Sequence, residues 1–141
     1  MPTSKSVCHF RFRVSNLLIH SKKNGLVTCK TPIPTFYNDL SPDEAAKAVT
    51  GLVPTAADAF TDPSQHEGWA EFPVTFVLCT EDNAWGPADQ QRMIDTCRAR
   101  EGRRGGPDAV EAVTLKSSHS PMLSMPGECA KVIRRAAGEV V

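Results

Sequence analysis

Two short apolar segments dominate the hydrophobic pattern of the chain. Residues 73–79 read Pro-Val-Thr-Phe-Val-Leu-Cys, and residues 110–116 read Val-Glu-Ala-Val-Thr-Leu-Lys. Their length and their β-branched and aromatic content predict two β-strands. The first segment is apolar almost throughout, which is typical of a strand covered on both faces in a parallel sheet.

Each predicted strand is followed by a segment with helical periodicity. A helix is expected to begin near Pro87, and a second after the Ser-Met-Pro sequence at 124–126. The order strand, helix, strand, helix predicts a βαβα unit with a right-handed crossover, and therefore an α/β fold. The apolar stripe of the first helix consists of Met93, Ile94 and Cys97, and that of the second of Cys129, Val132, Ile133, Ala136, Ala137 and Val140.

The segment before the first strand predicts helices and loops. Ser41 is a candidate N-cap, Pro42 suits the first helical position and Glu44 completes a capping box, so a helix is expected from there to Pro54. We expect loops at 24–40, which carries Gly25, Pro32 and Pro34, and at the glycine-rich stretch 101–108. A further short helix is expected between Asp62 and Glu71.

The pattern suggests a tail and one partial domain. Residues 1–23 alternate apolar and basic positions without an obvious partner strand, and they are predicted to be a poorly ordered N-terminal tail. Residues 24–141 form the predicted domain, divided into a region at 24–72 and the βαβα unit at 73–141.

Composition and charge narrow the classes of function. The 141 residues fit one ordinary domain, and 16 basic and 16 acidic side chains give no net charge. The charge is unevenly distributed along the sequence. Residues 1–40 contain six basic side chains and one acid, residues 41–90 contain one basic side chain and nine acids, and residues 91–141 contain nine basic side chains and six acids. The basic residues neither cluster nor alternate with aromatics, so no nucleic-acid partner is expected.

The five cysteines lie at positions 8, 29, 79, 97 and 129, without a CxxC spacing. They are predicted to be small buried residues in a reducing compartment, so a cytoplasmic protein is expected. No apolar run is long enough for a membrane span, and no ligand cluster has the spacing of a metal site. Neither a membrane partner nor any cofactor is therefore expected.

The candidate chemistry lies just after the two predicted strands. Asp82 comes three residues after Cys79, and His119 comes three residues after Lys116. Adjacent parallel strands lie about 4.8 Å apart and end at the same edge, so the two side chains are expected to meet. An acid that accepts the Nδ1–H of a histidine fixes its tautomer and prepares it as a general base. Glu81 is an alternative acid for the same role.

These residues resemble a known family. The run Cys-Thr-Glu-Asp-Asn-Ala-Trp-Gly-Pro at 79–87, the Gln-Gln pair at 90–91 and the Ser-His-Ser-Pro sequence at 118–121 are similar to the C-terminal part of the α/β-hydrolase superfamily. The branch with plant hydroxynitrile lyases, methylesterases and fungal hydrolases of secondary metabolism is the most similar. The resemblance covers residues 24–141 and implies that Asp82 is the triad acid, His119 the triad base and 24–72 part of a cap.

The chain departs from the family at the nucleophile. The family's serine lies in a Gly-x-Ser-x-Gly elbow, and no such motif occurs in this sequence. Ser118 and Ser120 flank the histidine but are not on an elbow. We therefore expect a truncated hydrolase that would act on an ester or similar bond of a small molecule, and that is inactive as this chain alone.

Two other interpretations stay open. The chain is either a non-catalytic fragment of the family or a binding or scaffold module that retains the βαβα core. In both cases the strand edge that lacks a neighbour is expected to favour self-association. The sequence does not separate a lyase or methylesterase reaction from simple hydrolysis.

Overall fold

The computed structural model describes residues 25–60, 62, 66–100 and 107–141. The predicted tail at 1–23 lies outside this part of the chain. The described residues divide into two compact units, and the larger consists of Thr31–Leu52 and Gly68–Val141. The smaller unit includes 25–30 and the described residues of 53–67. The sequence-based division at residue 72 stays a prediction.

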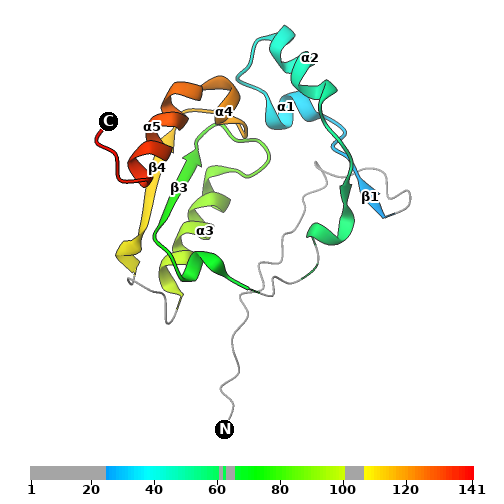
Figure 1. Cartoon of the computed structure of the whole chain (residues 1–141). Coiled ribbons are helices and arrows are strands. Elements are labelled where there is room, and N and C mark those ends of the chain that lie inside the picture. The colour runs from blue at the N-terminus through cyan, green and yellow to red at the C-terminus, as the bar shows by residue number, and fades with distance from the viewer. Residues whose placement is uncertain (1–24, 61, 63–65, 101–106) are drawn as a thin grey trace. The chain divides into compact units, whose positions relative to one another are not determined.

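The larger unit contains the predicted parallel strand pair. Strand β3 spans Val74–Cys79 and strand β4 spans Val110–Leu115, and the two pair in parallel from Val74↔Val110 to Cys79↔Leu115. Figure 1 shows the two arrows side by side, with helix α3 in the connection between them. Both strands therefore end at the same edge, as the apolar segments of the sequence predicted.

Helix α3, Pro87–Ala99, begins at the predicted residue. Pro87 occupies a first-turn position, where its missing N–H costs no hydrogen bond. Ile94 is fully buried, while Met93 and Cys97 are half-buried, so the predicted inner face is the observed one. A 3₁₀ turn, Pro107–Ala109, leads into β4. The rest of the predicted loop, 101–106, is outside the described residues.

The two-stranded sheet is less covered than the sequence predicted. Five of the six residues in β3 are half-buried and only Cys79 is buried. Among the described residues, β3 and β4 pair only with each other. A sheet of this width has two edges and a small area, so the expectation that β3 is covered on both faces was wrong.

Two helices follow β4. The short helix α4, Pro121–Ser124, was not predicted, and helix α5, Pro126–Ala136, begins at the predicted signal. In α5, Val132 is buried, but Ile133 is 68 % exposed. The apolar stripe was therefore identified correctly as helical, but only part of it is buried.

Two helices precede the sheet in the larger unit. Helix α2, Pro42–Thr50, has the predicted capping box, in which Ser41 and Glu44 exchange side-chain to backbone hydrogen bonds. Helix α1, Pro32–Phe36, replaces a segment that was predicted to be a loop. Its prolines lie within the first turn, where no intrahelical N–H is needed, so they are compatible with a helix.

The smaller unit contains a second difference from the prediction. Strands β1, Leu26–Val27, and β2, Thr55–Ala56, form a two-residue antiparallel ladder, and a 3₁₀ turn follows at Ala57–Phe60. Ladders this short leave no periodic pattern in a sequence. The helix predicted between 62 and 71 is limited to the 3₁₀ turn η2, Gly68–Ala70, in the larger unit, with 63–65 outside the described residues.

The parallel strand pair and its helices make the fold α/β. None of the helices in the described residues is long and apolar enough to cross a membrane.

Candidate active site

Asp82 lies in the turn that follows β3 and is only 7 % exposed. Its Oδ1 accepts the backbone N–H groups of Ala84 at 2.7 Å and Trp85 at 2.9 Å. An aspartate that accepts from the backbone two residues ahead stabilises a tight turn, and these donors satisfy a carboxylate that burial would otherwise destabilise. The turn therefore fixes the direction of Oδ2.

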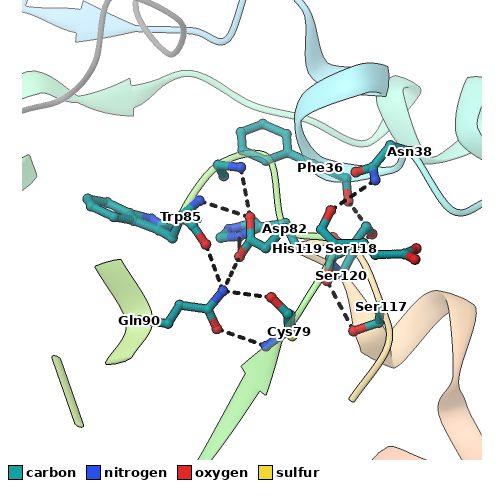
Figure 2. A network of polar contacts seen from close by, with 12 residues as sticks. Phe36, Asn38, Cys79, Asp82, Trp85, Gln90, Ser117, Ser118, His119 and Ser120 are labelled. Carbon is teal, nitrogen blue, oxygen red and sulfur yellow. Dashed lines mark hydrogen bonds and ion pairs between the residues drawn. The ribbon is translucent and has the colours of Figure 1, made fainter. Parts of the chain in front are cut away.

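Gln90 on α3 ties this turn to the strand. Its Oε1 accepts the N–H of Cys79 at 2.8 Å, and its Nε2 donates to the Cys79 carbonyl at 2.9 Å and to the Trp85 carbonyl at 2.6 Å. The same Nε2 lies 3.5 Å from Oδ2 of Asp82. Figure 2 shows this amide between the end of β3 and the turn. One side chain thus satisfies both polar backbone groups at the last residue of the strand.

His119 lies in the loop after β4, and its ring faces Asp82. Nδ1 of His119 and Oδ2 of Asp82 are 2.9 Å apart. The side chain of His119 is 36 % exposed, and the ring of Phe36 lies over it with a centroid distance of 5.3 Å and a 37° tilt. The predicted meeting of the two side chains is confirmed, and the imidazole has one engaged nitrogen and an open side.

The structure decides between the two candidate acids. The side chain of Glu81, 44 % exposed, forms a 3.6 Å ion pair with Lys116. The backbone N–H groups of the turn hold Oδ1 of Asp82, and Oδ2 of the same carboxylate lies against Nδ1 of His119. The acid that contacts the histidine is therefore Asp82.

The serines around His119 are part of its support. Ser117 and Ser118 are fully buried, and Ser120 is buried as well. The Ser118 hydroxyl donates a hydrogen bond to the carbonyl of Phe36 at 3.0 Å. The same oxygen accepts a hydrogen bond from the backbone N–H of Ser120 at 3.3 Å. With its hydroxyl held in this way, Ser118 supports the loop.

Burial and hydrogen bonding shift the pKa values of two other groups near the strand ends, Cys79 and Asp39. Burial raises the pKa of the Cys79 thiol, which favours its neutral form. Partial burial also acts to raise the pKa of Asp39, but hydrogen bonding to Ser118 holds it below its ordinary value. Asp39 is therefore an anion that the His119 loop stabilises.

The cysteines at 29, 79, 97 and 129 are free thiols, and Cys8 is outside the described residues. Within the described ranges, no group of three His, Cys, Asp or Glu side chains could hold a metal ion. The chemistry available at the site is proton transfer by a histidine held by a buried carboxylate.

Comparison with known proteins identifies the family. The sequence profile of the alpha/beta hydrolase family matches residues 9–132. The chain belongs to the alpha/beta hydrolase family. The match begins within the segment 1–23, ahead of the point at which the resemblance in the sequence starts.

Two curated fungal relatives agree with this assignment. The chain is 30 % identical to Probable hydrolase R7 of Phoma sp. over 112 residues, which are 79 % of this chain and 44 % of that protein. It is 31 % identical to Alpha/beta hydrolase nvfD of Aspergillus novofumigatus over 106 residues, 75 % of this chain and 39 % of that protein. The chain thus spans less than half the length of these alpha/beta hydrolase relatives.

Sequence reasoning missed some of the residues that support the site. Gln90 was noted only as part of a motif, and Asp39 and Phe36 only as part of a cap. Asp39 and Phe36 reach Ser118 across 79 and 82 positions of sequence. No local pattern signals contacts at that separation, whereas a glutamine on the buried face of a helix that follows a strand is a signal for Gln90.

Proposed function

We propose that this chain carries the acid and the base of a hydrolase active site that acts on an ester or similar bond of a small molecule. Asp82 orients His119, and His119 takes the proton of the attacking nucleophile. The observation that carries the proposal is the 2.9 Å contact between Oδ2 of the buried Asp82 and Nδ1 of His119.

The chemistry follows from the contact. A carboxylate can only accept a hydrogen bond, so it favours the tautomer with the proton on Nδ1. The lone pair is then on Nε2, which can remove a proton from a nucleophile. The imidazolium that results is stabilised by the nearby carboxylate. The names of the two fungal relatives, both called hydrolases, support this reaction class.

The nucleophile is proposed to lie outside this chain. The sequence contains no Gly-x-Ser-x-Gly motif, and the relatives are more than twice as long as the parts that match. An exchange of segments provides a direct test, in which the 106 residues of this chain that match the nvfD protein replace the matching segment of that protein. We expect the chimera to hydrolyse p-nitrophenyl acetate.

Variants of the chimera test the roles of the two residues. Asp82→Asn and His119→Ala are each expected to lower kcat by roughly 10³- to 10⁴-fold with the chimera still folded. The control is Gln91→Leu, because Gln91 is exposed and, within the described part of the chain, its side chain bonds to Asp95. Equal activity in the His119→Ala chimera would refute the proposal.

The second candidate function is a non-catalytic binding module, which the lack of a nucleophile motif favours. The 141-residue chain by itself is expected to show no hydrolysis above background under either function. Hydrolysis that disappears in His119→Ala would instead place a nucleophile within this chain. The segment-exchange chimera distinguishes the two functions, because only a catalytic dyad makes its hydrolysis depend on His119.

A further inference from the structure

The segment 34–39, which comprises the last three residues of α1 and the first residues of the connection to α2, contacts the loop that carries Asp82. The side-chain Nδ2 of Asn38 donates to the carbonyl of Glu81 at 3.0 Å. In the opposite direction, Nδ2 of Asn83 donates to the carbonyl of Pro34 at 2.8 Å. These two hydrogen bonds hold the residues on both sides of Asp82.

The same segment also contacts the loop that carries His119. Oδ2 of Asp39 accepts the backbone N–H of Ser118 at 2.8 Å, and the Phe36 carbonyl accepts the Ser118 hydroxyl. The Phe36 ring lies over the imidazole of His119. Figure 2 shows Phe36 and Asn38 beside Ser118 and His119. One short segment therefore holds both loops of the dyad.

The hydrogen bonds between the two strands position only the first residues of each loop. Backbone hydrogen bonds from Thr80 to Leu115 and from Glu81 to Ser117, each 3.0 Å, continue the pairing just beyond β3 and β4. Asp82 and His119 lie one and two residues past these last paired positions. Their separation therefore depends on contacts outside the sheet.

We propose that residues 34–39 are a clamp that sets the geometry of the Asp82–His119 pair, with Asp39 as its positioning residue. Asp39 acts through the Ser118 N–H, which precedes His119 in the chain. The lowered pKa of the Asp39 carboxyl supports this role, because it shows that the anion is stabilised by Ser118. The consequence for catalysis rests on the proposed function, but the geometry does not.

The tautomer of His119 reports the clamp without a substrate. We expect ¹⁵N NMR of the neutral ring to show mainly the Nδ1–H tautomer in the intact chain, because Asp82 accepts that proton. Asp39→Ala removes the acceptor for Ser118 and is expected to shift the signals toward the tautomer mixture of free histidine. Asp39→Asn keeps an acceptor oxygen and is expected to restore the tautomer of the intact chain.

Two further variants keep the test decisive. Asp43→Ala is the matched control, since Asp43 is an exposed acid four residues away with no role in the clamp. Asn38→Ala removes only an exposed hydrogen bond, so it is expected to keep the fold and to shift the tautomer less than Asp39→Ala. An unchanged tautomer in folded Asp39→Ala, or in Asn38→Ala where Asp39→Ala fails to fold, overturns the clamp.

The outcomes separate the clamp from the proposed function. In the segment-exchange chimera, Asp39→Ala is expected to lower kcat about tenfold or more because small displacements of catalytic groups cost large factors. A tautomer shift with an inactive chimera would refute the catalytic proposal and leave the clamp. An active chimera that needs His119 but tolerates Asp39→Ala would refute the clamp and leave the catalytic proposal.

Discussion

Gln90 joins the end of a strand, a turn and a helix through one amide group. Its donors and acceptor satisfy the N–H and carbonyl of Cys79 and the carbonyl of Trp85, all at or beside the turn that holds Asp82. Gln90 is itself buried. A buried polar group with every partner present costs little, whereas removing one partner leaves the others unsatisfied.

At the residue scale we therefore expect Gln90→Leu to be strongly destabilising. The substitution leaves the two Cys79 groups without the partner, and each unsatisfied buried group costs about 1–3 kcal/mol, so a loss of about 2–4 kcal/mol in the free energy of unfolding is expected. Urea unfolding measures it. The matched control is Gln91→Leu on the exposed side of α3, expected to lie within about 0.5 kcal/mol of the intact chain. Equal losses would contradict the role of Gln90.

The lowered pKa of Asp39 predicts that the free energy of unfolding depends on pH. Its pKa is below its ordinary value of 3.8 in the folded chain, so the folded state binds the proton less readily than the unfolded state. The stability that Asp39 contributes is thus present above the unfolded pKa and is lost as the pH falls through the lower folded pKa. The difference in unfolding free energy between the intact chain and Asp39→Asn is expected to stay constant above about pH 5 and to shrink as the pH falls below about 4. A difference independent of pH would contradict this.

At the scale of elements, local signals and packing contribute differently. The capping box of α2 lies within four residues, and it was predicted because each partner is adjacent in sequence. Helix α1 was missed because proline was interpreted as an interruption, although both prolines suit a first turn. The apolar stripe of α5 was found, but its burial depends on neighbours outside the stripe.

The capping box gives a prediction at this scale. Ser41→Ala removes the acceptor for the Glu44 N–H and is expected to cost about 1 kcal/mol of unfolding free energy. Ser41→Asp supplies another oxygen at the N-cap and is expected to recover most of it. Thermal unfolding compares the three proteins. Identical melting temperatures for Ser41→Ala and the intact chain would show that α2 does not depend on its cap.

At the scale of the whole molecule, the sheet sets the limits on stability. Two strands leave a free edge on each side among the described residues, and large apolar side chains such as Phe72, Met122 and Ile133 are exposed. A two-stranded sheet is a small structure to support a 141-residue chain. Free edges also invite pairing with other chains.

We therefore expect the purified chain to self-associate. Sedimentation velocity over a range of concentrations is expected to show a mass that rises with concentration, because the free edge of one copy can pair with that of another. The urea transition is expected to be broad and to depend on concentration. A monomer at all concentrations with a sharp two-state transition would contradict this expectation.

The sequence by itself determined the parallel strand pair, the starts of α2, α3 and α5, and the positions of Asp82 and His119 at one edge of the sheet. These follow from periodicity and capping, which depend on neighbours within a few residues, and from the rule that parallel strands end together. The tertiary structure decided which acid faces His119, since Glu81 and Asp82 are adjacent and only the turn selects between them. It also revealed the clamp at 34–39 and the extent of the exposed apolar surface, because both depend on contacts between segments far apart in the chain.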